Sequence, residues 1–232
     1  MSVPKRLRRL VWFGVIFLVV IGVAAVTRRT LVLLWPAQFG GVRANPAAAL
    51  DTSFAPHKIL TLIHILPGAF FLMLAAVQFM PSVRNKHLRL HRWMGRCLVV
   101  LGVVIGTSAL VMSYKMNIGG PNETAATTLF AILFLICLVK GYIHIRRKEV
   151  ARHREWMIRG VAIALGVATV RPIMGVFFAT SRLTHLTPHD FFGTAFWIGF
   201  TINLVAAEAW LHRGRSRTAT ITESSTKQRE VA

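Results

Sequence analysis

Two short strings in the sequence combine histidine and arginine in the same order, and this combination could hold a redox cofactor. The first runs from His91 to Arg96 (HRWMGR) and the second from His153 to Arg159 (HREWMIR), with one residue inserted. Neutral imidazoles are common axial ligands of haem iron. Two of them facing each other would form a haem b site, so the strings make His91 and His153 candidate metal ligands.

The arginines of the two strings could hold the propionate groups of that haem, because the guanidinium group binds carboxylates with paired hydrogen bonds. Positive charge near the iron would also raise its reduction potential. At the level of lipid headgroups, the same side chains would instead bind anionic lipids. Both interpretations stay open for the four residues Arg92, Arg96, Arg154 and Arg159.

A further histidine and a further arginine lie inside apolar runs, where an ionisable side chain costs roughly 2.5 to 3.5 kcal/mol. His64 precedes Pro67 and Gly68, which loosen a helix and remove side-chain bulk, and Arg171 precedes Pro172. At 1.5 Å per residue, both would lie roughly 10 to 14 Å below the outer surface. We expect one outer site for quinone, a second haem or a lipid phosphate. The alternatives are a histidine bonded to a neighbouring helix and an arginine that extends outward.

Three polar residues near the ends of apolar runs complete the candidates. His144 is a less favoured alternative ligand of the haem. We expect Glu208 to pair with an arginine of one of the two strings, and Asn203 to form a hydrogen bond between helices. These pairings would be structural.

The elements that position these residues must be membrane helices. The chain is 54% hydrophobic with a mean hydropathy of +0.56, and backbone groups in lipid are satisfied only in helices or closed barrels. The sequence predicts an all-α, polytopic transmembrane bundle of about six spans. They are residues 10–26, 58–80, 93–114, 124–144, 156–179 and 191–211.

The net charge of +20 is distributed in the short stretches between the apolar runs, so we interpret it as a topology signal and expect no nucleic-acid partner. Basic stretches before the third and fifth spans place those loops in the cytoplasm. We therefore expect a bacterial inner (plasma) membrane protein with both termini cytoplasmic. The exception to the charge pattern is the segment after the first span, with Arg28, Arg29 and Arg43.

The predicted organisation has four parts: an N-terminal signal-anchor helix (1–27), an extracytoplasmic loop (28–57), a helical bundle (58–212) and a disordered cytoplasmic tail (213–232). The two histidine-arginine strings open the third and fifth spans. Spans two and three would thus repeat as spans four and five, giving a four-helix core of two hairpin repeats. Cys97 and Cys137 lack metal-type spacing and are expected to pack as apolar residues.

Several stretches of the chain resemble the bacterial family of predicted multipass membrane proteins called domain of unknown function 2306. The resemblance covers about residues 54–211 and implies fold and membrane location without an activity. A looser similarity is to cytochrome b-type membrane oxidoreductases, which carry paired histidines near each face; here the repeat partner of His64 is Ala126, so one haem fits better than two. The matching family stretches are His64 to Gly68, Gln78-Phe79, His91-Arg92 with Gly95-Arg96, His153 to Arg159, Arg171, and Asn203 to Glu208.

The leading functional hypothesis is haem b-binding electron transfer with a quinone or a respiratory-chain protein as partner. One alternative is a non-enzymatic assembly factor or a scaffold that binds the lipid bilayer through anionic lipids and needs no cofactor. Another is a small transporter that uses His64 and Arg171 as its substrate site. No string typical of nucleotide binding or hydrolase chemistry occurs, so no catalytic residue is predicted.

Overall fold

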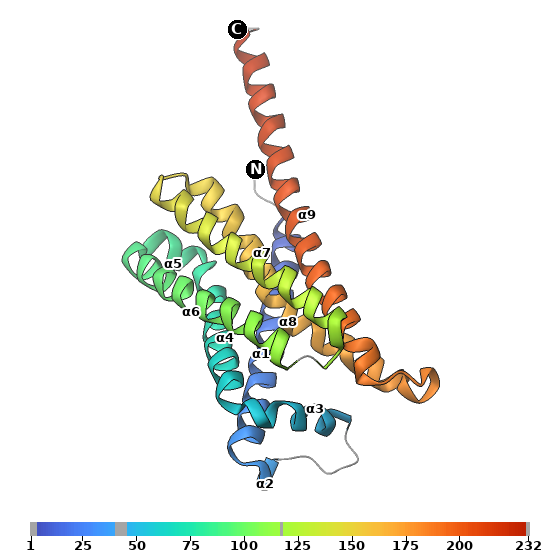
Figure 1. The fold of residues 1–232 in the computed structure, drawn as a ribbon. Helices are drawn as coiled ribbons and strands as arrows, with labels where there is room; N and C mark the ends of the chain where they lie inside the picture. The colour runs from blue at the N-terminus through green and yellow to red at the C-terminus, as the bar shows by residue number, and fades with distance from the viewer. Residues whose placement is uncertain (1–3, 40–45, 117, 231–232) are drawn as a thin grey trace.

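The computed structural model describes residues 4–39, 46–116 and 118–230, and the regular elements in these ranges are all helical (Figure 1). The predicted all-α fold is confirmed. The elements are α1 (Lys5–Leu34), α2 (Pro36–Phe39), α3 (Pro46–Phe54), the 3₁₀ helix η1 (Ala55–His57), α4 (Lys58–Gln78), α5 (Pro81–Lys86), α6 (Leu88–Lys115), α7 (Gly120–Arg146), α8 (Val150–Thr184) and α9 (Pro188–Glu230).

Six helical stretches are long and apolar enough to cross a membrane, as predicted: α1, Leu50–Gln78, α6, α7, α8 and Pro188–Gly214. Even the shortest has 27 residues, which is about 40 Å of helix against about 30 Å of hydrocarbon. Large apolar side chains on these helices face outward; Phe13 is 74% exposed and Phe70 57%. In a bilayer, lipid chains would cover them.

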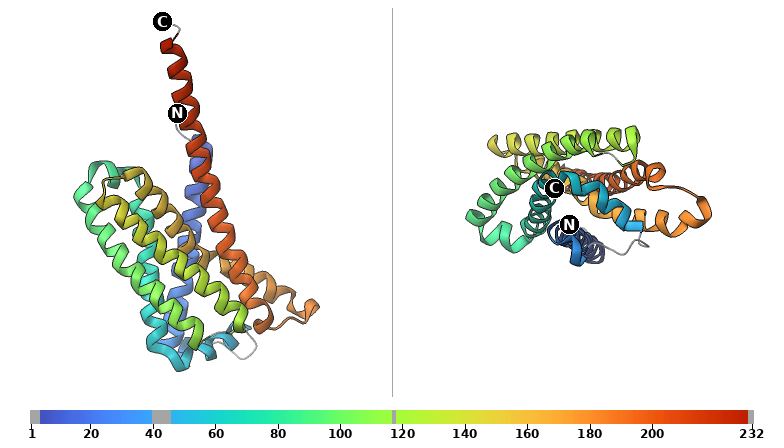
Figure 2. Two further views of the ribbon diagram at one scale, coloured as in Figure 1. Left: turned by 45° about the horizontal axis from the view of Figure 1, so that its top comes forward. Right: turned by 60° about the horizontal axis from the view of Figure 1, so that its bottom comes forward.

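The four central helices form two antiparallel hairpins that pack side by side. The first consists of α4 and α6, joined through the short α5, and the second of α7 and α8; α6 contacts α7. The first span, α1, packs against α4 and α8, while α9 packs against α8 and α7 (Figures 1 and 2). We call the end of the bundle with α5 the α5 end, and the opposite end, where α3 lies across the bundle, the α3 end.

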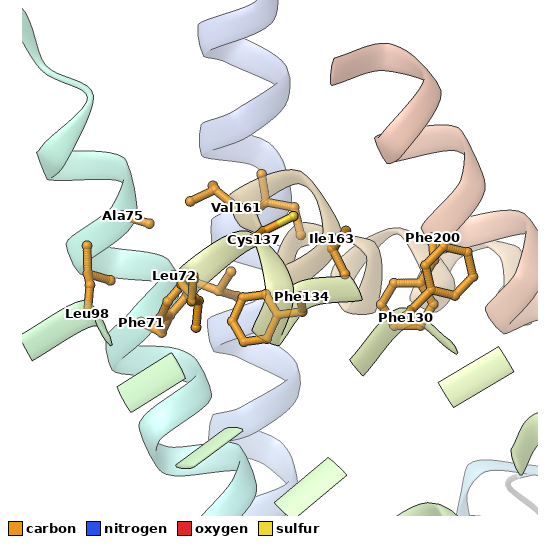
Figure 3. Close-up of a cluster of buried hydrophobic side chains, with 12 residues drawn as sticks. Phe71, Leu72, Ala75, Leu98, Phe130, Phe134, Cys137, Val161, Ile163 and Phe200 are labelled. Carbon is orange, nitrogen blue, oxygen red and sulfur yellow. The ribbon is translucent and has the colours of Figure 1, made fainter. Parts of the chain in front are cut away.

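Side chains from α4, α6, α7, α8 and α9 fill the centre of the bundle (Figure 3). Phe71 of α4 is fully buried and meets Phe134 of α7 edge-on, with ring centroids 5.5 Å apart. Gly102 of α6 permits this packing, because a Cβ there would collide with Leu138. Cys137 is buried in the same cluster with a free thiol, as expected for an apolar packing residue. This core fixes the two hairpins against each other and so positions the side chains at both ends.

The segment expected as an extracytoplasmic loop, residues 28–57, is largely helical in its described part. Helix α1 continues to Leu34, and α3 lies across the end of the bundle (Figure 1). The physical reason is an ion-pair network between α1 and Asp51 of α3, which draws α3 back onto the bundle. Residues 40–45, including Arg43, lie outside the described residues.

The C-terminal segment also differs from the expected disordered tail, because α9 is helical to Glu230 and extends beyond the bundle (Figure 1). The expectation rested on polar composition. No proline follows Pro188 in the chain, so the backbone chemistry that ends helices most strongly is absent from this stretch. Residues 231 and 232 lie outside the described residues.

Candidate functional site

Two arginines of α1 and one aspartate of α3 meet near the α3 end. Arg28 donates to both carboxylate oxygens of Asp51, at 3.2 and 2.7 Å. The neighbouring Arg29 donates to the same carboxylate, and its guanidinium carbon lies 4.1 Å from the ring centroid of Phe54. The Asp51 side chain is almost fully buried. This network fixes α3 to α1 and gathers two positive charges around one negative charge.

Arg171 of α8 brings a third positive charge to this region. Its charge interacts electrostatically with those of Arg28 and Arg29. Arg171 is exposed, and none of the ion pairs formed among the described residues includes it. We call the group of residues Arg28, Arg29, Asp51, His64 and Arg171 the arginine site.

The three spans that carry the arginine site converge beside it. A Cβ on Gly22 of α1 would lie 2.8 Å from Leu72 Cδ1 of α4 and 3.6 Å from the Cβ of Ala168 of α8. Along each of these three helices, every residue that belongs to the arginine site lies within about two helical turns of this contact, on the side of the α3 end. The glycine contact therefore closes the bundle on one side of the site, and the site lies between this contact and α3.

The contacts of Ser108 favour one tautomer of His64 on α4. Its Nδ1 lies 2.9 Å from Ser108 Oγ, which itself lies 2.6 Å from the Val104 carbonyl and 3.1 Å from the Ile105 carbonyl. The hydroxyl has one proton and donates it to these helix carbonyls, so it accepts from His64. Nδ1 therefore carries the ring proton and Nε2 the lone pair. The charge of Arg171 also acts on this ring.

The helix faces beside the arginine site are open. A Cβ added to Gly68 of α4 or to Gly175 of α8 would meet no neighbouring atom within 4 Å. On the same helices, Ile63 is 49% and Val176 63% exposed. Apolar chains of a lipid can contact these faces.

His91 and His153 occupy equivalent places at the α5 end of the two hairpins. Gln78 Nε2, at the end of α4, donates to the His91 carbonyl at 2.8 Å. His153 Nδ1 donates to the carbonyl of Gly141, near the end of α7, also at 2.8 Å. Each residue is thus tied to an earlier helix of its own hairpin, His91 through its backbone carbonyl and His153 through its side chain. The two imidazoles interact electrostatically, and His91 Nδ1 is buried with no hydrogen-bond partner among the described residues.

The four arginines predicted to hold propionates have different surroundings. Arg92, Arg96 and Arg154 are exposed. Arg159 binds Glu208 of α9 through Nε at 2.5 Å and Nη2 at 3.0 Å, which confirms the pairing expected for Glu208. The predicted hydrogen bond of Asn203 between helices is also present, to Thr169 at 2.8 Å. Arg159 therefore holds α8 to α9.

An open cavity of about 440 Å³ lies beside Arg159 at the α5 end. Its charges occur in pairs; His144 Nδ1 lies 2.6 Å from Glu149 Oε2, and Arg159 lies 3.8 Å from Glu155. The cavity thus has no clear excess of either charge, in contrast to the arginine site. Its lining residues are His144, Arg152, Glu155, Trp156 and Arg159.

Sequence reasoning missed the network of Arg28 and Arg29 with Asp51 and treated the two arginines as an exception to the charge pattern. A signal for it was available. Asp51 is the first acidic residue of the chain, and the next is Glu123. Two arginines lie at the end of one span, and a single acidic residue lies shortly before the following span. This pattern indicates an ion pair, because buried charges need partners.

A family model described as a predicted membrane protein, DUF2306, matches residues 61–211. This range contains both hairpins except the first three residues of α4, and most of the last span. His64 and Arg171 lie inside it, whereas α1 and Asp51 lie outside it. No curated protein and no solved structure matches the chain. Among the described residues, no group of three or more His, Cys, Asp or Glu side chains could hold a metal ion.

Proposed function

The chain belongs to the DUF2306 family of predicted membrane proteins, and we propose that it is a lipid-binding scaffold whose arginine site holds the phosphate of an anionic lipid. The observation that carries this proposal is a charge imbalance. Arg28, Arg29 and Arg171 bring three positive charges to this region, and among the described residues their ion pairs involve a single carboxylate, that of Asp51. A bound monoanionic phosphodiester would offset one of the two excess charges.

The position of Arg171 makes this imbalance costly without a ligand. Arg171 is 13 residues from the end of α8 at Thr184, which is about 20 Å along the helix. A charged group at membrane depth costs several kcal/mol unless it meets a counter-charge or water. A phosphate accepts the paired hydrogen bonds that a guanidinium group donates, so it fits Arg171 in charge and geometry.

A lipid is favoured over free phosphate by the surroundings of the site. The exposed apolar residues Ile63 and Val176 lie on the helices that carry His64 and Arg171. Burial of apolar surface against acyl chains adds about 25 cal/mol per Å² of area. Inorganic phosphate would gain nothing from these faces, so its affinity should be far lower.

The test compares the affinity of purified protein in detergent for dioctanoyl phosphatidylglycerol and dioctanoyl phosphatidylcholine by isothermal titration calorimetry. Arg171→Gln should weaken phosphatidylglycerol binding about tenfold or more, because a hydrogen bond to a charged group contributes about 1.5 to 3 kcal/mol. The matched control is Arg182→Gln, an exposed arginine near the end of the same helix.

Equal losses in Arg171→Gln and Arg182→Gln would mean that net charge alone attracts the lipid, and would contradict a specific site. Displacement of phosphatidylglycerol by inorganic phosphate at the same concentration would contradict a lipid ligand. No preference of the wild type for phosphatidylglycerol over phosphatidylcholine would overturn the proposal as a whole.

A second candidate function, haem b-dependent electron transfer to a quinone or respiratory-chain protein, is favoured by the hydrogen bond of His153. Because Nδ1 donates to the Gly141 carbonyl, the lone pair is on Nε2, as in many metal-ligating histidines. His91 would be the second axial ligand, and the exposed Arg92, Arg96 and Arg154 would hold propionates; Arg159 is engaged by Glu208. Haem bound there would supply one-electron transfer.

This second candidate is tested by a reduced-minus-oxidised absorbance spectrum of protein expressed with haem precursor. A b-type α band that disappears in His91→Ala and in His153→Ala, and persists in His144→Ala, would support it. A folded, helical protein without such a band would exclude it. That result would leave the lipid-binding proposal untouched, because the arginine site lies at the other end of the bundle.

The cellular location that fits these features is a bacterial inner membrane with both termini in the cytoplasm. Basic residues are dense in the α4–α6 and α7–α8 connections, at the α5 end, which favours that end as the cytoplasmic one. The arginine site would then face the outer leaflet. The arginines of the site would be exceptions to the rule that basic residues lie on the cytoplasmic side. Asp51 and the proposed phosphate would offset their charge.

A further inference from the structure

The imidazole of His64, on which the charge of Arg171 acts, carries one hydrogen-bond acceptor. The proton of the ring is on Nδ1, which donates to Ser108 Oγ, so Nε2 carries a lone pair. The arginines of the site offer donors only. A ligand that satisfies the whole site must therefore accept hydrogen bonds from the guanidinium groups and donate one to Nε2.

A phosphodiester group alone cannot do both, because it carries no proton at neutral pH. The donor must come from the remainder of the headgroup, as an ammonium or a hydroxyl group. An ammonium group would be repelled by the excess positive charge of Arg28, Arg29 and Arg171. A hydroxyl group is neutral and meets no such repulsion.

We infer that the arginine site recognises an anionic lipid whose headgroup carries a hydroxyl, as in phosphatidylglycerol, with the phosphate bound by Arg171 and a headgroup hydroxyl donating to His64 Nε2. This inference rests on the proposed function and specifies its ligand class. Helix α8 supplies the anion contact and α4 the hydroxyl contact. Beside the site, Leu72 of α4 and Ala168 of α8 both lie close to Gly22 of α1.

The test compares two lipids of equal charge, dioctanoyl phosphatidylglycerol and dioctanoyl phosphatidylmethanol; the second has a methyl group in place of glycerol and so carries no headgroup hydroxyl. The wild-type protein should bind phosphatidylglycerol about fivefold more tightly, the factor that one neutral hydrogen bond of about 1 kcal/mol gives. His64→Phe should abolish this preference, because it removes the ring nitrogen that accepts the hydrogen bond. His64→Gln, whose amide oxygen can accept a hydrogen bond, should restore part of the preference.

Equal affinities for the two lipids in the wild type would overturn the hydroxyl inference, and this comparison needs no variant to fold. The proposed function would survive that result if both lipids bound more tightly than phosphatidylcholine, and would fail if neither did. A preference that persists in His64→Phe would also overturn the inference. Soluble glycerophosphoglycerol that displaces the lipid at equal concentration would assign the site to a free phosphodiester and overturn the lipid ligand.

Discussion

The Glu149 carboxylate, in the turn between α7 and α8, is held by His144, whose Nδ1 lies 2.6 Å from Glu149 Oε2. This hydrogen bond, aided by the charges of Arg152 and Arg147, keeps the pKa of Glu149 below its ordinary value of 4.5. A group whose pKa is lowered in the folded state stabilises the fold above the ordinary pKa. That contribution is lost as the pH falls through the lowered value.

We therefore expect the thermal midpoint of the purified protein to fall on acidification below pH 4.5 by more in the wild type than in Glu149→Gln. The difference should be small, because exposed charges are screened by solvent. A thermal unfolding series in detergent at several pH values measures it. His144→Gln removes the other partner and should behave like Glu149→Gln; the same acid-induced fall in all three proteins would contradict the contact.

Contacts between polar side chains within the membrane could be predicted from single residues where each side chain had one evident partner. Glu208 and Asn203 lie on the last span, and a polar side chain there must meet another span. Their contacts with Arg159 and Thr169 follow that reasoning. The tautomer of His64 could not be predicted, because it depends on Ser108, 44 positions away in the sequence.

The close approach of α8 and α9 depends on glycine, and this allows a prediction at the scale of helices. A Cβ on Gly199 of α9 would lie 2.6 Å from Val170 Cγ2 and 3.0 Å from the Val170 backbone nitrogen. The backbone atom cannot rotate away, so Gly199→Ala must push the two helices apart. We expect a loss of about 1 to 3 kcal/mol in the free energy of unfolding.

Gly175→Ala is the matched control for Gly199→Ala, because it places the same methyl group in a membrane helix with no neighbouring atom within 4 Å. Its unfolding free energy should stay at or slightly above the wild-type value, since alanine favours the helix over glycine. Unfolding by sodium dodecyl sulfate, followed by circular dichroism, measures both variants. Equal stability of the two variants would refute the glycine contact.

The sequence was sufficient to predict the six spans because long apolar runs have few structural solutions in lipid. The predicted start of the third span, Trp93, lies inside α6, which begins at Leu88, because hydropathy marks the apolar part and not the helix end. Helix α3 was not predicted, since its place depends on Asp51 meeting Arg28 across 23 positions. The periodicity of apolar residues is local and does not predict contacts between residues so far apart in the sequence.

At the scale of the whole molecule, the even number of spans places the start of α1 and the end of α9 on the same side of the bundle (Figure 1). The α4–α6 and α7–α8 connections lie on that side too. Their basic residues, from Arg84 to Arg92 and from Arg146 to Arg154, resist translocation across the membrane. Arg28 and Arg29, at the opposite end, are held by Asp51, so they add little to the opposing signal.

This arrangement predicts the behaviour of reporter fusions in a bacterial host. Alkaline phosphatase, which is active only outside the cytoplasm, should be inactive when fused after Ala232, while green fluorescent protein fused there should fluoresce. A fusion of alkaline phosphatase after Lys115, at the α3 end of α6, should be active.

Replacement of Asp51 by asparagine tests the link to the arginine site: Arg28 and Arg29 would lose their counter-charge, and fusions should report a mixed orientation of α1. If, in the wild type, alkaline phosphatase were active after Ala232 and inactive after Lys115, the topology would be the inverse of the one predicted. The arginine site would then lie in the cytoplasmic leaflet.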